Sequence, residues 1–412
     1  MWRSLGRFSG TNAMKTITAK LLLFCSLLIS TAVGSAQSWT MTSAPVKDYW
    51  NSIACSANGM TLAATLSSGG ANSAGLYLST NSGATWQTNL PTSLSHVAIS
   101  ADGTVLAAEF GGTVFVSTNG GASWQTNSLI GQDLDTIACS ADGMTLLVTD
   151  PAGNRGNLIV STNSGLTWAT NALAGKNWTG VASSADGTKL IAVASFVGSG
   201  GGQVLTSTNS GTTWITNTIT SSNPAWASVA SSADGTKLAA GIGGSGGTVY
   251  TSPDGGNTWI SNSLPHYEWN SLACSADGSR LLACTEGDKQ IYTSTNFGLT
   301  WVSNAVPALS WVQGASSADG NTLVAAAPDS GIFLWQATPA PLLNIAAANG
   351  NLTFSWTVPS TNFVLQQSSD FSPGDWTTLT NLPALNLTNL LDQVSILPAN
   401  GNGFFRLVAQ PN

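Results

Sequence analysis

Three carboxylates of this chain stand where sugar chemistry would need an acid and a base. Asp48, Glu268 and Asp329 each lie beside a short apolar stretch that recurs along the sequence. Glycoside hydrolysis requires two carboxyl groups roughly 5 to 10 Å apart, one as acid and one as base or nucleophile. If the repeats described below close into a ring, the three residues come from neighbouring repeats. Two interpretations stay open: a hydrolytic pair within this trio, or solvated loop carboxylates.

Five tryptophans recur at one position, at the start of the first strand of a repeat. They are Trp50, Trp178, Trp226, Trp269 and Trp311, and the other two repeats carry Leu94 and Leu134 there. Partly exposed indoles around a concave site stack well on sugar rings and apolar ligands. We therefore expect a ligand site here, with a glycan or an extracellular protein as the partner. The alternative is that these rings pack between neighbouring sheets, as large side chains in repeats usually do.

Composition excludes other kinds of partner. The 412 residues include 12 Lys+Arg and 19 Asp+Glu, which gives a formal net charge of -7. Nucleic acid is a poor partner for such a chain, because phosphate binding requires clustered Lys and Arg. The only two histidines, His96 and His266, do not make a metal site, and no phosphate-loop motif occurs. We expect no cofactor and no metal ion.

The elements that must position these residues come from a repeat. The turn Ser-Ala-Asp-Gly occurs six times between two short apolar stretches, and Ser56–Gly59 is the same turn with Asn58 in place of Asp. Asx-Gly between two such stretches indicates a hairpin, since the Asx side chain caps the turn and Gly adopts a positive φ. The other turns are Ser100–Gly103, Ser140–Gly143, Ser184–Gly187, Ser232–Gly235, Ser275–Gly278 and Ser317–Gly320.

A second motif follows six of these turns. It reads Ser-Thr-Asn-Ser-Gly-Ala-Thr-Trp at Ser79–Trp86, and similar octets end at Trp124, Trp168, Trp214, Trp259 and Trp301. The repeat length, roughly 40 residues, suits four short strands with their turns, the size of a propeller blade.

The octets resemble the Asp box, Ser-x-Asp-x-Gly-x-Thr-Trp, of BNR-repeat propellers such as sialidases, xyloglucan-cleaving endoglucanases and photosystem II assembly factors. Only Ser252–Trp259 keeps the acidic residue, Asp254, and the other five copies have Asn81, Asn119, Asn163, Asn209 and Asn296. The resemblance covers residues 38 to 336. It implies an all-β fold, a seven-bladed β-propeller over 37–336, in which the box is structural and ligands bind over the central channel.

The resemblance also allows sialidase chemistry to be examined. Sialidases grip the substrate carboxylate with three arginines, and residues 37–412 contain Arg155, Arg280 and Arg406. Arg280 follows a Ser-Ala-Asp-Gly turn, on the face opposite the expected site, and Arg406 lies beyond the repeats. Sialidase activity is therefore disfavoured.

The seventh repeat lacks an octet. It ends with Ile332–Trp335, whereas Ser38–Thr42 near the other end of the repeats looks like the tail of an octet. We predict that this N-terminal segment supplies the outer strand of the last sheet and closes the ring, which removes an exposed edge.

The cysteines of the repeats do not suggest disulfides. Cys55, Cys139 and Cys274 occupy equivalent positions in repeats that are not adjacent, and the hairpin register places Cys284 opposite about Ser271. Since a disulfide needs Cα atoms within about 4.4 to 6.8 Å, we expect four free, buried thiols.

The two ends of the chain differ from the repeats. Residues 1–36 have a basic start, an apolar run and small residues before a cleavage site after Ala36, which indicates a signal peptide, with Met1 or Met14 as the start. Residues 337–341 form a Pro-rich linker. Residues 342–412 show short alternating stretches that suit a small β-sandwich, similar to fibronectin-III-like tails of secreted proteins.

Together these observations favour a secreted, periplasmic or surface-exposed monomer with no membrane span after cleavage. Its expected role is non-catalytic binding or scaffolding. A glycoside hydrolase of the xyloglucanase-like or sialidase-like type is the first alternative, and surface adhesion or envelope assembly is the second.

Overall fold

The computed structural model describes most of the chain from residue 39 onward. The described ranges are 39–45, 49–67, 74–129, 133–150, 156–173, 176–195, 201–219, 224–244, 246–265, 267–328, 330–336, 343–348, 351–357, 363–368, 376–379, 383–386, 391–396 and 404–409. Every regular element in these ranges is a β-strand. They contain no helix with the length and apolarity that a membrane crossing requires.

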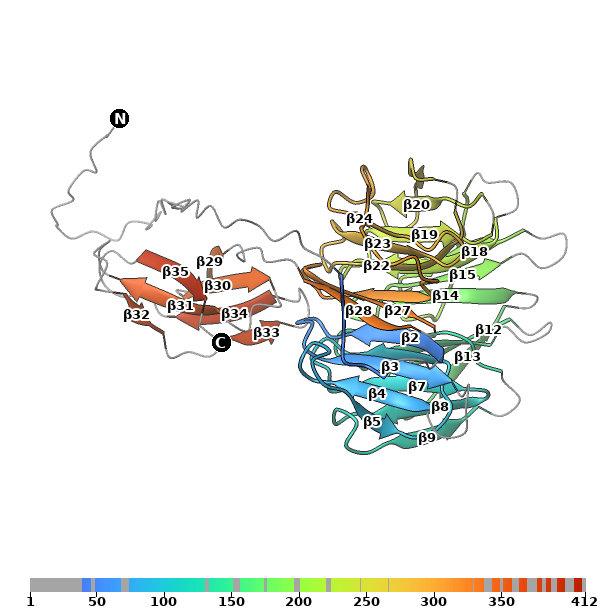
Figure 1. The fold of residues 1–412 in the computed structure, drawn as a ribbon, viewed down its shortest axis with the longest axis horizontal. Helices are drawn as coiled ribbons and strands as arrows, with labels where there is room; N and C mark the ends of the chain where they lie inside the picture. The colour runs from blue at the N-terminus through green and yellow to red at the C-terminus, as the bar shows by residue number, and fades with distance from the viewer. Residues whose placement is uncertain are drawn as a thin grey trace. The chain divides into compact units, whose positions relative to one another are not determined.

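Between residues 39 and 336 the described strands form seven four-stranded antiparallel sheets (Figure 1). In six sheets, four successive strands pair in chain order. The first three contain β2 (Tyr49–Cys55), β3 (Leu62–Ser67), β4 (Gly75–Ser79), β5 (Gln87–Leu90); β6 (His96–Ile99), β7 (Leu106–Phe110), β8 (Thr113–Ser117), β9 (Gln125–Ser128); and β10 (Ile137–Cys139), β11 (Leu146–Asp150), β12 (Asn157–Ser161), β13 (Ala169–Ala172). The next three contain β14 (Asn177–Ser183), β15 (Leu190–Ser195), β16 (Gln203–Ser207), β17 (Ile215–Asn217); β18 (Trp226–Ser231), β19 (Leu238–Ile242), β20 (Val249–Ser252), β21 (Ile260–Ser261); and β22 (Trp269–Cys274), β23 (Leu281–Thr285), β24 (Ile291–Ser294), β25 (Val302–Ser303).

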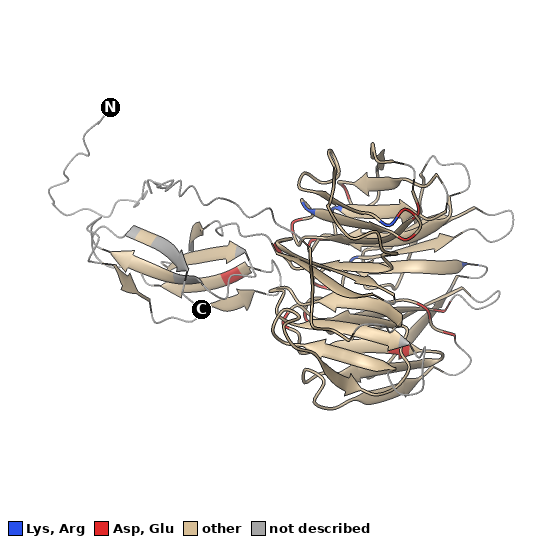
Figure 2. Ribbon diagram, in the orientation of Figure 1, with Lys and Arg blue, Asp and Glu red and all other residues tan. Residues whose placement is uncertain are grey.

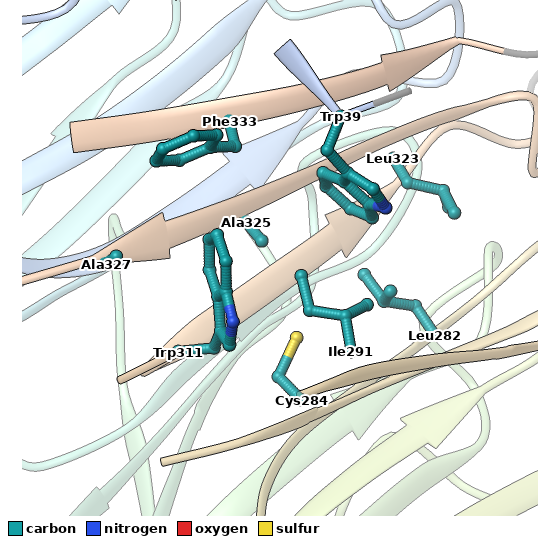
Figure 3. Close-up of a cluster of buried hydrophobic side chains, with 9 residues drawn as sticks. All are labelled: Trp39, Leu282, Cys284, Ile291, Trp311, Leu323, Ala325, Ala327 and Phe333. Atoms are coloured by element: carbon teal, nitrogen blue, oxygen red, sulfur yellow. The ribbon is translucent and has the colours of Figure 1, made fainter. Parts of the chain in front are cut away.

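The seventh sheet joins the two ends of the repeat region. Its order is β1-β28-β27-β26, built from β26 (Gln313–Ser316), β27 (Thr322–Ala327), β28 (Gly331–Gln336) and the N-terminal β1 (Thr40–Met41). Thr40 pairs with Leu334 and Met41 with Phe333. Just before β1, Trp39 packs into a core with Trp311 and Phe333 (Figure 3). The predicted donation of the outer strand by the N-terminal segment is confirmed.

The Ser-Ala-Asp-Gly turns join the first and second strands, as predicted. In the turn of the second sheet, Ser100 Oγ donates to Asp102 Oδ1 at 2.6 Å, and the same oxygen accepts from Thr104 N at 2.9 Å. Gly103 closes the turn at a φ of 79°, a conformation that costs glycine little. Asn58 makes the equivalent two bonds at 2.8 and 2.9 Å, so an amide serves this turn as well as a carboxylate.

The alanines of these turns form a closed cycle of hydrogen bonds, which we call the alanine ring. Each alanine N donates to the carbonyl oxygen of the alanine in the next sheet at 2.7–2.9 Å, and Ala318 N donates back to Ala57 O. The members are Ala57, Ala101, Ala141, Ala185, Ala233, Ala276 and Ala318. Seven sheets joined by a cycle of seven bonds form a closed ring.

The octets form the turns between the third and fourth strands. In the first of them, Asn81 Oδ1 accepts from Thr85 N at 2.9 Å, while Asn81 Nδ2 donates to Thr85 Oγ1 at 2.9 Å. Asp254 accepts from both the amide and the hydroxyl of Thr258, at 2.8 and 2.7 Å. The threonine hydroxyl rotates from acceptor to donor, which explains why Asn replaces Asp without loss of the turn.

Residues 343–409 contain two further sheets. One has the order β29-β30-β34-β33, from β29 (Asn344–Ala348), β30 (Asn351–Thr357), β34 (Leu391–Ile396) and β33 (Ala384–Asn386); the other is β32-β31-β35, from β32 (Thr377–Thr378), β31 (Phe363–Ser368) and β35 (Phe404–Ala409). Phe354 and Phe405, one from each sheet, lie 4.4 Å apart between ring centroids. The short strands predicted for residues 342–412 are present.

Candidate functional site

The five strand-one tryptophans do not line the channel. Their exposed fractions are 0–1%, whereas stacking on a ligand requires an accessible ring face. Each indole packs in a core between its own sheet and the preceding one; Trp50, for example, contacts Val324 and Ala326 of β27. Four of them also meet an aromatic ring of the same sheet edge-on, at centroid distances of 5.2–5.6 Å; the pairs are Trp50–Tyr77, Trp226–Tyr250, Trp269–Tyr292 and Trp311–Phe333. The structure gives these residues the packing role, which corrects the expectation that exposed indoles form the ligand site.

The residue after the tryptophan lines the channel instead. Strand pairing shifts by one residue after Trp50, Trp178, Trp226 and Trp269, which is a β-bulge. A bulge leaves one extra residue outside the ladder and re-aims the side chains around it. The extra residues Asn51, Thr179, Ala227 and Asn270 all lie in the wall of one cavity.

This mouth cavity, as we call it, has a volume of about 140 Å³ and receives side chains from all seven sheets. Its polar lining residues include Asn51, His96, Thr136, Thr179, Asn270 and Gln313. No carboxylate, lysine, arginine or cysteine is among its described lining residues. Several of the polar groups are held in place by backbone contacts: Thr179 Oγ1 donates to Trp226 O at 2.7 Å, and Gln313 Oε1 accepts from Ile53 N at 3.3 Å.

A second cavity lies where the first strands end, beside the alanine ring. It has a volume of about 150 Å³, and its lining includes Cys55, Cys139 and Cys274 among serines and alanines. Burial raises the pKa of the Cys55 and Cys274 thiols to about 12, and the Cys139 pKa is also raised. Because the thiolate is the reactive form, these thiols are poor nucleophiles and poor metal ligands.

The prediction of free thiols is confirmed for the cysteines of the repeats, but only Cys284 is a buried residue, and Cys55, Cys139 and Cys274 are half-buried. Cys55, Cys139, Cys274 and Cys284 are all free, and Cys284 pairs in register with Ser271. No group of three or more His, Cys, Asp or Glu residues in the described ranges is arranged to hold a metal ion.

Only one of the three candidate catalytic carboxylates can be placed. Asp48 and Asp329 lie outside the described residues, as do His266 and Arg155. Glu268 is half-buried and is not a lining residue of the mouth cavity. Arg280 packs over the turn at Gly320, at the end of the channel opposite the mouth.

A histidine–glutamate pair that the sequence analysis did not connect lies at the mouth. His96 and Glu109 pair across β6 and β7. Glu109 Oε1 contacts His96 Nδ1 at 2.9 Å and accepts from His96 N at 3.1 Å. The Glu109 side chain is completely buried, while the His96 side chain is 30% exposed and borders the cavity. The carboxylate thereby fixes the orientation of the imidazole.

Two more carboxylates stand beside this pair. Burial raises the pKa of Glu109, although the bonds from His96 oppose the rise, and the nearby charge of Asp135 adds to it. Burial likewise raises the pKa of Asp135, and the neighbouring Asp133 adds to it while His96 opposes it. We call His96, Glu109, Phe110, Asp133 and Asp135 the acidic rim of the mouth.

The sequence carried a signal for Glu109. It is the one carboxylate inside the apolar run of residues 106–110, at the strand position where Thr65, Thr149 and Val193 stand in other sheets. A charged residue in a run that is otherwise buried requires a partner, and the hairpin register places His96 opposite.

Comparison with solved structures gives the fold class. YCF48 from Cyanidioschyzon merolae is similar with a TM-score of 0.55 and 15% identity, over 73% of this chain and 98% of that chain. A structure described as YCF48 bound to D1 peptide has a TM-score of 0.55 and 17% identity, over 76% and 98%. The β-propeller domain of Cps50 (Swd1) from Myceliophteria thermophila has a TM-score of 0.56 and 13% identity, over 73% and 100%. This chain has a β-propeller fold.

Sequence comparison adds no family. No family model matches the chain, and no curated protein matches it. At identities of 13–17% the structural similarity concerns the fold alone, and function must be argued from the site.

Proposed function

We propose that this chain is an exported, seven-bladed Asp-box propeller that binds an extended protein segment at the mouth cavity without catalysis. The observation that carries the proposal is the convergence of polar side chains from seven sheets on one small cavity. Hydrogen-bonding groups held on rigid strands are suited to recognition, because little conformational freedom is lost on binding.

A protein ligand fits these groups better than a glycan does. Asn51, Asn270 and Gln313 carry amides that both donate and accept, as a peptide backbone does. Glycan binding depended on exposed indoles, and all five are buried. One of the similar propellers is described as bound to a peptide, which supports a protein partner by analogy of fold.

A binding role also fits the chemistry of the cavity. The described lining residues include neither a carboxylate pair nor a thiol, and the thiols at the other cavity have raised pKa values. His96 is the one lining residue whose side chain commonly acts as a general base, and its hydrogen-bonded partner is the buried Glu109.

The remaining parts of the proposal concern the two ends of the chain. Residues 1–36 act as a signal peptide that is cleaved after Ala36, and the two sheets of residues 343–409 form a fibronectin-III-like sandwich. N-terminal sequencing of the exported protein should begin at Gln37; retention of residues 1–36 would contradict cleavage.

The test of binding uses a library of random 12-residue peptides displayed on phage and selected on the chain from residue 37 to 412. Affinities of selected peptides are measured by calorimetry for the wild type and for Ala227→Trp. Ala227 is a bulge residue in the cavity wall, so the indole fills part of the cavity. We expect the variant to lose at least tenfold in affinity.

The matched control places the same indole away from the cavity. Thr212 is exposed in the octet turn between β16 and β17 and is not a lining residue of the mouth cavity, so Thr212→Trp should leave the affinity unchanged. Failure to select any peptide that Ala227→Trp weakens would refute the proposed site. A glycan array run on the same proteins would reassign the ligand if a glycan shows that pattern instead.

A further inference from the structure

The acidic rim holds a buried carboxylate with an incomplete set of partners. Glu109 Oε1 has two contacts with His96, but Oε2 is buried and has no hydrogen-bond partner among the described residues. Burial of an ionised carboxylate is costly unless a cation or several donors compensate it. The single imidazole therefore leaves part of this charge uncompensated.

The carboxylates near Glu109 add to the negative charge of the acidic rim. Asp135, half-buried, and Asp133, exposed, lie on the segment that precedes β10 and contribute to the same electrostatic cluster. Among the described residues, His96 on β6 is the one basic side chain whose charge acts on Glu109 and Asp135. The described residues of the β6–β9 and β10–β13 sheets include no lysine or arginine, and charged residues are sparse over the described part of the propeller (Figure 2).

An exposed aromatic residue, Phe110, follows Glu109 in β7. Phe110 is 50% exposed at the end of β7. Gly111 O accepts from Leu134 N at 2.8 Å, so the backbones of Phe110 and Asp135, the residues next to this bond, lie close together. A long basic side chain places its alkyl stem on such a ring and its charge beside the carboxylates, and the ring face itself attracts a cation.

We propose that the acidic rim binds a positively charged side chain, a lysine ammonium or an arginine guanidinium, of the segment held in the mouth cavity. The inference rests on the proposed peptide-binding role and specifies what the peptide carries. An organic cation fits better than a metal ion, because the described His, Cys, Asp and Glu residues form no metal-holding group.

The test uses a lysine side chain alone, so that it does not depend on a peptide being found. Nα-acetyl-lysine methylamide is titrated into the chain from residue 37 to 412, and the imidazole signals are followed by NMR. The sequence has two histidines, and loss of one signal in His96→Gln assigns His96. Nα-acetyl-norleucine methylamide serves as the uncharged probe.

We expect saturable movement of the His96 signal with the lysine probe and none with the norleucine probe. Asp135→Asn should weaken the lysine affinity about five- to tenfold, as loss of one partly desolvated ion pair does. Glu109→Gln, which keeps the oxygen that His96 contacts, should also weaken it. Asp142→Asn is the control, since it removes the same charge from the turn at the opposite end of the same sheet.

Equal effects of the two probes, or equal effects of Asp135→Asn and Asp142→Asn, would overturn the inference. Thermal unfolding of each variant verifies that it is folded. If phage peptides bind at the mouth without preference for Lys or Arg, the result supports the proposed function and contradicts the proposed binding of a basic side chain by the acidic rim. If the lysine probe binds but no peptide does, the result supports cation binding by the acidic rim and contradicts peptide binding at the mouth cavity.

Discussion

The two ends of the channel are built from the same seven strands but differ in how strictly they repeat. At the turn end, every sheet supplies an alanine whose N donates to the next sheet at 2.7–2.9 Å. At the mouth, equivalent positions carry Asn51, Thr179, Ala227 and Asn270, and one sheet adds the buried Glu109. The backbone groups of the alanine ring are paired with one another, while at the mouth Glu109 Oε2 is buried without a hydrogen-bond partner among the described residues.

The difference separates residues that hold the ring from residues that can recognise a ligand. A position that must make the same bond seven times has little freedom to vary. A position that faces the channel does not make the same bond in every sheet, so its side chain can differ from sheet to sheet. The strand-one tryptophans belong to the first group although they adjoin the second, and in four of the sheets a one-residue bulge separates their packing from the cavity.

The largest expected effect comes from Trp269→Ala, which tests the division between packing and recognition at the adjacent residues Trp269 and Asn270. Trp269 is fully buried, donates from Nε1 to Gly247 O at 3.2 Å and packs against Tyr292. Trp269→Ala should lower the free energy of unfolding by about 3–5 kcal/mol, through lost burial and the cavity left behind. Urea unfolding measures this.

Asn270→Ala is the counterpart on the cavity side of the same bulge. It should cost stability about 0–1 kcal/mol, because the bond from Asn270 to Glu286 at 2.9 Å is exposed, yet it should weaken a mouth-binding peptide. Equal destabilisation by the two variants would show that the bulge does not divide packing from recognition.

The second-largest expected effect concerns Asp319, in the turn at Ser317–Gly320. Burial raises the pKa of Asp319 to about 6, against hydrogen bonds from Ser317 and Asn321 and the charge of Arg280. Between pH 3.8 and about 6, Asp319 is therefore protonated in the folded state. In the unfolded state, where its pKa is near 3.8, it has lost the proton in this pH window. Stability contributed by this group falls as pH rises through that window, and the loss persists at higher pH.

Asp319→Asn should remove this penalty and raise the free energy of unfolding by roughly 1–3 kcal/mol at pH 7, with no gain at pH 3. Asn58 shows that an amide makes the same turn. Asp186→Asn is the control. Burial tends to raise the pKa of Asp186, but the bonds from Ser184 and Thr188 outweigh it and lower the pKa, so loss of this carboxylate should destabilise the protein at pH 7. A gain for Asp319→Asn that is independent of pH would argue against this explanation.

The smallest expected effect concerns one octet position at which some copies have serine and others have glycine. Ser210 has a φ of 51°, while Gly120 and Gly255 take the same position in other octets with φ values of 66° and 70°. Ser210→Gly should stabilise the protein by about 0.5–1 kcal/mol, since relief of the left-handed conformation exceeds the entropy that glycine adds to the unfolded chain. Thermal unfolding measures the gain, and a lower midpoint would contradict it.

Much of the architecture followed from local patterns. The Asx-Gly turns predicted the hairpins, the octets predicted the turns before the outer strands, and the tail-like segment at residues 38–42 predicted the pairing of β1 with β28. The hairpins and the octet turns depend on hydrogen bonds whose partners lie within a few residues, so the sequence displays them directly. The β1–β28 pair joins Thr40 to Leu334 and followed instead from the likeness of residues 38–42 to the end of an octet. The free thiols and the Cys284–Ser271 register followed from the same hairpin geometry.

The candidate site was only partly predictable. The right strand position was found, but the choice between Trp269 and Asn270 required the bulge, which depends on how the sheet packs against its neighbour. His96 and Glu109 face each other in a register that the turn at residues 100–103 already implies, so that pair could have been predicted. Its proximity to Asp135 could not, because it arises between two sheets.

The sequence by itself determined the repeating unit, its turns and the strand that completes the last sheet, since identical local chemistry recurs seven times. Tertiary structure decided which side of each first strand faces the channel and which charges meet at the mouth. Those outcomes depend on packing between sheets, where side chains distant in the chain compete for the same space and a shift of one residue reverses the face that a side chain occupies.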